Sequence, residues 1–194
     1  MPDALGQAVP VSGAFGPVFS LDGVTPKIAP DAFIAPTAAV IGDVTIGSET
    51  GIWFQCLVRG DLQFIHIGAR TNIQDGAIIH VDSGGFSTTI GDDVTVGHNA
   101  VIHACTLRNR AFVGISATVL DGAVIEEGGM LAAGGLLTPG KVIGPNELWA
   151  GTPARLLRVM SPEERTKFDR NAEVYRELAR RFRSGLRSIG AGPS

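Results

Sequence analysis

Apolar residues recur at six-residue intervals through the middle of the chain, and this period constrains the fold more than any other feature. A small residue often follows directly, as in Ile46-Gly47 and Ile90-Gly91. Ordinary strands alternate every two residues, whereas an inward apolar residue and a small turn residue repeated every six are typical of a parallel β-helix. The period predicts such a coil, built on four runs: Ile34, Val40, Ile46, Ile52 and Val58; Ile67, Ile73 and Ile79; Ile90, Val96 and Ile102; and Leu107, Val113, Val119, Ile125, Leu131, Leu137, Ile143 and Trp149.

The repeat changes phase at three places. Two intervals are longer than six residues, around residues 59–66 and 82–88, and one is shorter, from Ile102 to Leu107. Insertions into a solenoid become loops on one face, which is often the binding face. Each phase change lies beside a histidine or an Arg/Asp pair, so we expect function at these loops.

Composition excludes several classes of protein. The chain has 194 residues and a formal net charge of −3 without a basic block, so we expect one domain and no nucleic-acid partner. Two cysteines, Cys56 and Cys105, form no disulfide framework and indicate a reducing compartment. The opening residues MPDALGQAVP lack the charge and apolar core of a signal peptide, and no apolar run is long enough to cross a membrane. These features predict a cytoplasmic protein without a membrane partner.

The C-terminal region has a different pattern. Ser161-Pro162-Glu163-Glu164 is a capping box with Pro at the first helical position. Apolar residues then follow helical spacing as far as Leu186, which predicts an amphipathic helix lying along the coil. We therefore expect an N-terminal extension over 1–20, the repeat coil over 21–157, the helix over 158–188 and a disordered tail over 189–194.

Three of the four histidines lie within the repeats. His80 follows the inward Ile79, and His103 follows the inward Ile102. If residues 82–88 form a loop that replaces no repeat, these positions are three hexapeptides, or one rung, apart. The two imidazoles then occupy one corner of the coil on successive rungs, about 4.8 Å apart, where they can share one metal ion.

His98 lies one repeat earlier and points from another face, so it is not expected to reach a metal held by its own chain. A neighbouring coil in a cyclic trimer could supply it, and three histidines with an open water position form a known catalytic zinc set. Each histidine taken alone is also consistent with a surface or turn residue. His66 is off the pattern, and we predict that it is a loop residue.

Several motifs together resemble the γ-class carbonic anhydrase family of left-handed β-helix proteins. The resemblance covers about residues 20–185 and includes the family's phenylacetate- and carnitine-pathway relatives. It implies an all-β fold, a left-handed parallel β-helix with the C-terminal helix packed along it. The motifs are Arg59-Gly60-Asp61, Asn72-Ile73-Gln74-Asp75-Gly76, Ile79-His80, Gly97-His98, Ile102-His103-Ala104-Cys105 and Gly151-Thr152-Pro153-Ala154.

The resemblance implies a homotrimer with three metal sites at subunit interfaces. His80 and His103 come from one chain and His98 from the next. The metal is Zn²⁺, with Fe²⁺ or Co²⁺ as alternatives. The implied activity is reversible hydration of carbon dioxide to bicarbonate by a metal-bound hydroxide.

Further residues take roles by the same resemblance. Arg59 and Asp61 form an ion pair between subunits, and Gln74 orients the metal-bound water. Three other residues support or approach the site, although their types are equally common in turns or in a hydrophobic core: Asn72, Asp75 and Tyr175.

The chain departs from the family pattern where protons leave the site. The archetype has a Glu directly after the residue matched by Asp61, and this chain has Leu62. The archetype's acidic loop is replaced by residues 81–86, whose one carboxylate is Asp82. Asp82 is a candidate substitute; without a shuttle, proton transfer limits turnover.

Three alternatives stay open. The metal-bound water could attack a thioester, as expected for an acyl-CoA thioesterase or a related acyl handler. A hexapeptide acyltransferase would use a histidine base without metal, which the three histidines argue against. Finally, Leu62 and the weakly acidic loop are consistent with a catalytically silent assembly protein.

Overall fold

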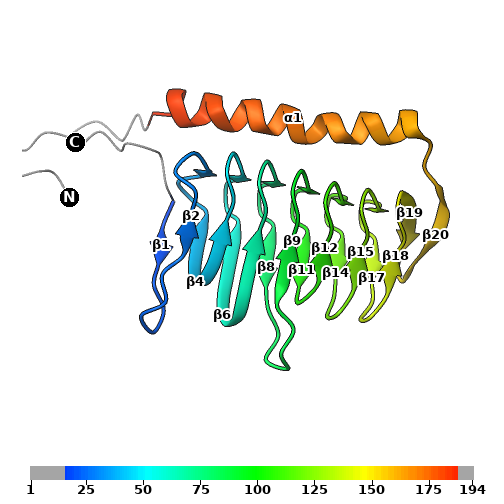
Figure 1. Ribbon diagram of the computed structural model, residues 1–194, viewed down its shortest axis with the longest axis horizontal. Helices are drawn as coiled ribbons and strands as arrows, with labels where there is room; N and C mark the ends of the chain where they lie inside the picture. The colour runs from blue at the N-terminus through cyan, green and yellow to red at the C-terminus, as the bar shows by residue number, and fades with distance from the viewer. Residues whose placement is uncertain (1–15, 188–194) are drawn as a thin grey trace, which may run out of the picture.

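The computed structural model describes residues 16–187, and it forms a parallel β-solenoid of about seven turns with one helix along its length (Figure 1). Most of the expected N-terminal extension and the whole of the expected disordered tail lie outside the described residues. Within that part, no helix combines the length and apolar character needed to cross a membrane. The solenoid and its helix confirm the predicted all-β coil with a C-terminal helix.

The coil has three faces, each a ladder of short parallel strands. The first face holds β1 (Val18–Phe19), the start of β4 (Ala39–Ile46), the start of β6 (Leu57–Ile67), β8 (Ile78–His80), β11 (Val101–His103), β14 (Thr118–Val119) and β17 (Leu136–Leu137). The second holds β2 (Lys27–Ile28), the ends of β4 and β6, β9 (Thr88–Ile90), β12 (Thr106–Leu107), β15 (Val124–Ile125) and β18 (Val142–Ile143). The third holds β3 (Phe33–Ile34), β5 (Gly51–Ile52), β7 (Asn72–Ile73), β10 (Thr95–Val96), β13 (Phe112–Val113), β16 (Met130–Leu131), β19 (Glu147–Gly151) and its antiparallel partner β20 (Ala154–Val159).

The inward residues of the hexapeptides stack to form one continuous core. Ile52 pairs with Ile73 on the next rung, and Ile79 pairs with Ile102; all four are fully buried. Burying one such side chain contributes about 1.5–3 kcal/mol, so each rung is stabilised mainly by its three inward residues. The six-residue period therefore identifies both the core and the register of the strands.

The two cysteines lie in this core as free thiols. Burial raises the pKa of Cys56 to about 12. Burial likewise raises the pKa of Cys105. Both thiols therefore stay protonated and serve as small core residues, as expected of a chain without a disulfide framework.

Two long strands turn a corner between the first and second faces without ending. Gly42 has a φ of +77°, and a Cβ there would lie 2.3 Å from the carbonyl oxygen of Gly60 on the next rung. Residues 61–64 bulge outward where β4 has a single residue between its paired positions. The expected loop is thus a short bulge within β6, and the prediction for His66 was wrong: it lies in β6 and pairs with Thr45 and Thr89.

Helix α1 (Pro162–Gly185) lies along the third face. It is on the side opposite the loops at the corner between the first and second faces (Figure 1). It begins with the expected capping box: Ser161 accepts a hydrogen bond from Glu164 N, and Ser161 N donates to the Glu164 carboxylate. It is shorter than the expected 158–188, because β20 continues through Val159 before the cap. Ala172 and Ala179 face the coil and are buried.

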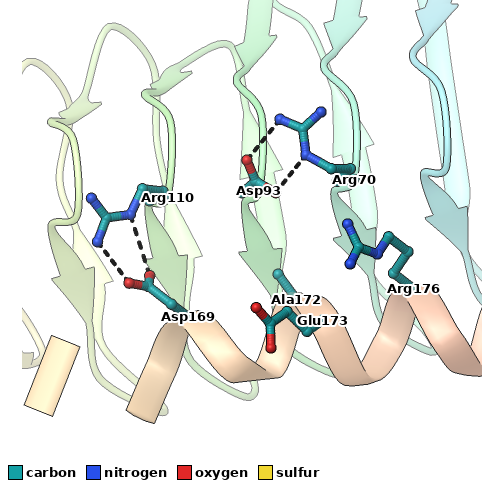
Figure 2. Close-up of a pocket in the computed structure, with 7 residues that line it drawn as sticks. All are labelled: Arg70, Asp93, Arg110, Asp169, Ala172, Glu173 and Arg176. Atoms are coloured by element: carbon teal, nitrogen blue, oxygen red, sulfur yellow. Dashed lines mark hydrogen bonds and ion pairs between the residues drawn. The ribbon is translucent and has the colours of Figure 1, made fainter. Parts of the chain in front are cut away.

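Ion pairs fasten the helix to the corner between the second and third faces. Figure 2 shows Arg110 of the coil directed at Asp169 on α1, with an Nη2–Oδ2 distance of 2.6 Å. Arg165 on α1 is 5% exposed and donates to Gly128 O at 2.9 Å as well as to Asp169. These contacts set the position of the helix along the coil, and with it the placement of the side chains that α1 adds to the site.

Candidate metal centre

His80 and His103 lie side by side at the corner between the first and second faces. They end β8 and β11 and are directly paired in the ladder, so residues 82–88 contain no hidden repeat. Nδ1 of His80 and Nε2 of His103 are 3.2 Å apart. Two ligands of a tetrahedral zinc ion, each at 2.0–2.1 Å, stand about 3.3 Å from one another. The spacing of the two imidazoles therefore fits a shared metal ion.

A carboxylate holds the outer nitrogen of each ring. His80 Nε2 lies 2.9 Å from Asp61 Oδ1, and His103 Nδ1 lies 2.5 Å from Asp121 Oδ1. A carboxylate can only accept, so each outer nitrogen carries the proton and each inner nitrogen presents a lone pair. Two lone pairs at this distance repel unless a cation lies between them. Carboxylates behind metal-binding histidines commonly fix the ring in this way.

Asp61 is ionised in this arrangement. Partial burial acts to raise its pKa, but the hydrogen bond from His80 and the neighbouring Arg59 guanidinium outweigh it, so the pKa lies below its ordinary value. Arg59 Nη1 pairs with Asp61 Oδ2 within one chain. This pair lies beside the histidines, and the expected ion pair between subunits stays a prediction.

His98 lies at a different corner, between the third and first faces and next to α1. Its Nδ1 is 3.1 Å from Asp75 Oδ2, and its Nε2 is 3.3 Å from the Tyr175 hydroxyl. In the described part of a single chain, no three His, Cys, Asp or Glu side chains converge to hold a metal ion. One chain thus carries a histidine pair at one edge and a lone histidine at another.

Gln74 and Asn72 belong to the same side of the coil as His98. They are 4% and 2% exposed, and Gln74 Nε2 donates to Asn72 Oδ1 at 3.0 Å and to Asn171 Oδ1 on α1 at 3.3 Å. Asn72 Nδ2 in turn donates to Thr95 Oγ1 at 3.0 Å. Neither amide lies at the His80 corner of its own chain, so Gln74 could orient a ligand there only from a neighbouring copy.

Tyr175 serves the core and the site together. Its ring packs edge-on against Trp53, with centroids 5.3 Å apart, while its hydroxyl faces His98. Burial, followed by the charge of Asp75, raises the pKa of Tyr175. The hydroxyl therefore stays protonated at neutral pH and can donate to the histidine.

Comparison with known proteins identifies the family. No family model matches the sequence, so the family is identified from individual relatives. The γ-carbonic anhydrase 2 of Arabidopsis thaliana, named as mitochondrial, is 45% identical over 160 residues, or 80% of this chain, and the chain spans 58% of that relative's length. The carbonic anhydrase of Geobacillus kaustophilus is 44% identical over 167 residues, which cover 86% of this chain and 91% of the relative.

The chain belongs to the γ-carbonic anhydrase family. Among solved structures, a hexapeptide transferase family protein from Anaplasma phagocytophilum superposes with a TM-score of 0.82 at 46% identity, covering 88% of this chain and 98% of that one. Names within this group of similar proteins thus include both anhydrase and transferase, and the site has to distinguish the two chemistries.

The residues after Asp61 form an exposed, largely apolar edge of the candidate site. Leu62 projects from the β6 bulge with 54% of its surface exposed, and Phe64 beside it is also exposed. With Leu21 and Val24 they line a cavity of about 320 Å³ that reaches Asp61. Asp82 Oδ2 accepts from Gly84 N at 2.7 Å, within its own loop.

Two residues of this candidate site were not predicted from the sequence. Asp121 lies 18 residues after His103, which is three hexapeptides and therefore the same corner one rung on. A search at that interval would have found it. Asn171 could not have been found in this way, because the repeat carries no information on how α1 is positioned over the coil.

Proposed function

We propose that this chain hydrates carbon dioxide reversibly to bicarbonate at metal sites formed between the subunits of a cytoplasmic homotrimer. The main support is the histidine pair: His80 Nδ1 and His103 Nε2 face one another at 3.2 Å, each ring backed by a carboxylate. Imidazole ligands suit Zn²⁺, with Fe²⁺ or Co²⁺ as the alternatives. Membership of the γ-carbonic anhydrase family supports the same reaction.

The division of the site between two corners supports a cyclic assembly such as the proposed trimer. His98 of one copy completes the ligand set of His80 and His103 on the next, since a catalytic zinc site needs three protein ligands and an open position. Asp75 orients the His98 ring through Nδ1, so Nε2 is the nitrogen that would bind the metal, in place of its contact with the Tyr175 hydroxyl at 3.3 Å. Because the Gln74 amide lies on the same side of the coil, it arrives with His98 and orients the nucleophile.

A zinc ion held by these histidines would lower the pKa of bound water to about 7 and so would supply a nucleophile at neutral pH. The proton released must then reach solvent. Leu62 carries no titratable group, and the Asp82 carboxylate is engaged with its own loop. Buffer and water therefore carry the proton away in this proposal, and turnover is limited by that step.

The test is stopped-flow hydration of carbon dioxide by anaerobically purified protein loaded with Zn²⁺ or Fe²⁺. We expect metal-dependent hydration by the wild type and none by His103→Ala, which loses one ligand. His66→Ala is the matched control, since His66 lies away from the pair in β6. A wild type that binds metal without hydrating carbon dioxide would contradict the proposal.

The cavity beside Asp61 favours a second candidate, hydrolysis or transfer of a thioester-bound acyl group. Its volume of about 320 Å³ would admit a group far larger than carbon dioxide, and its lining combines the apolar Leu21, Val24, Leu62 and Phe64 with the carboxylates of Asp22, Asp43 and Asp61. The transferase name of the Anaplasma structure points the same way. Short acyl-CoA substrates, assayed with the same variants, decide between the candidates. Absence of both activities from the metal-loaded wild type would leave the silent assembly protein.

A further inference from the structure

We infer that Asp121 is a positioning residue for the metal centre, holding His103 with Nε2 directed at the shared ion. The inference deepens the proposed function and depends on its metal site. Its basis is the contact of 2.5 Å between Asp121 Oδ1 and His103 Nδ1. None of the motif residues that carry the resemblance to the γ-carbonic anhydrase family was assigned to orient His103.

Asp121 completes a column of four side chains at one corner of the coil. Asp61, His80, His103 and Asp121 come from four successive rungs, in the order carboxylate, imidazole, imidazole, carboxylate. Each carboxylate accepts a hydrogen bond from the outer N–H of the neighbouring ring, so both free lone pairs point at the middle of the column. A metal ion placed there meets two rings already in the correct tautomer and orientation.

The same arrangement separates the three candidate ligands from the fourth histidine. His80 contacts Asp61, His98 contacts Asp75 and His103 contacts Asp121. In the described part of the chain, His66 has no carboxylate within ion-pair distance. A carboxylate therefore accompanies each histidine of the proposed site and not the one outside it, as expected if the contacts serve metal binding.

The backbone around Asp121 is rigid, whereas its side chain adds little to folding. Gly122 has a φ of +65° and donates to Ala104 O at 2.8 Å, and Gly140 N donates to Asp121 O at 2.9 Å. The Asp121 side chain is 39% exposed. Exposed ionic contacts contribute about 0–1 kcal/mol. Removing the carboxylate should thus alter the orientation of His103 more than the stability of the coil.

The experiment measures Zn²⁺ affinity by competition with a chelating indicator, and the visible spectrum of bound Co²⁺, for Asp121→Ala and Asp121→Asn. Asp43→Asn is the matched control, because Asp43 is an exposed carboxylate at the same corner with no contact to either histidine. We expect Asp121→Ala to bind Zn²⁺ about 10–100-fold more weakly, as for other carboxylates behind metal-binding histidines. Asp121→Asn should lose less Zn²⁺ affinity, since its amide oxygen can still accept a hydrogen bond from His103 Nδ1–H.

The outcomes separate the inference from the proposed function. Affinity and Co²⁺ spectrum unchanged in both Asp121 variants, with binding lost in His103→Ala, would overturn the role of Asp121 and leave the metal site standing. Equal binding by the wild type and His103→Ala would remove the metal site itself. If Asp121→Ala does not fold, the isosteric Asp121→Asn decides, with Asp43→Asn expected to match the wild type.

Discussion

In the proposed mechanism, Leu62 stands where a residue relaying the proton would be needed. It follows Asp61, whose carboxylate contacts His80, and it projects from the β6 bulge into solvent. A leucine cannot relay a proton, so the rate in the proposed mechanism depends on buffer. The chemistry of the ligand set and the rate of proton release are thus separable at the level of single residues.

Leu62→Glu should raise kcat for hydration about 100-fold at low buffer concentration, the lower end of the range for a positioned general acid–base group. The gain should shrink as buffer concentration rises and buffer takes over the transfer. Stopped-flow rates across a buffer series measure the effect, and Leu62→Gln is the control of matched size. Equal rates for the Glu and Gln variants would show that proton release is not limiting.

At the residue scale, the sequence predicted which residues lie at the same corner, because they are separated by whole numbers of hexapeptides. The pairing of His80 with His103 follows from an interval of three hexapeptides, and the structure has it. Side-chain contacts across rungs, such as Asp121 with His103, depend on rotamers that the period does not specify. His66 was assigned to a loop because a phase change was taken for a break in the strand, whereas β6 bends at the corner and continues.

At the scale of elements, α1 has two roles on the third face, one in the core and one at the candidate site. It covers the apolar flank of the coil and delivers Tyr175 to His98 and Asn171 to Gln74. Its position depends on Asp169, which forms an ion pair with Arg110 of the coil (Figure 2). Asp169 also pairs with Arg165 of its own helix. Capping and apolar spacing predicted the helix itself, but not these contacts, since the repeat does not determine which charges will meet.

Asp169→Asn should destabilise the protein by roughly 1–3 kcal/mol at neutral pH, the range for hydrogen bonds to charged groups. Burial acts to raise the pKa of Asp169, but Arg110 and Arg165 outweigh it and lower the pKa below the ordinary 3.8. Its contribution to stability is therefore present above that ordinary pKa and is lost as pH falls through the lowered folded value. The difference between wild type and variant should accordingly shrink in acid.

Urea unfolding at neutral pH and at successively lower pH measures that difference. Glu173→Gln is the control, since Glu173 is an exposed carboxylate on the same helix, four residues after Asp169. It should leave the free energy of unfolding close to that of the wild type. A constant difference between wild type and Asp169→Asn across the pH range would contradict the assigned role.

At the scale of the whole molecule, the fold was the most predictable feature. The six-residue period determines the strand ladders, the inward core and the corners, because every rung repeats the same packing. The relation between copies is not contained in the period. It is inferred from the placement of His80 with His103 on one edge of the coil and His98 on another.

The most direct test of a shared site is complementation between two inactive variants. His98→Ala keeps the His80 and His103 pair, and His103→Ala keeps His98, so each variant alone should lack metal-dependent hydration. The two chains are co-expressed with different tags, and mixed trimers are purified on both. Each mixed trimer contains one complete interface of three, so we predict about a third of the wild-type metal content and activity. Mixed trimers as inactive as their parents would contradict a site shared between neighbouring chains.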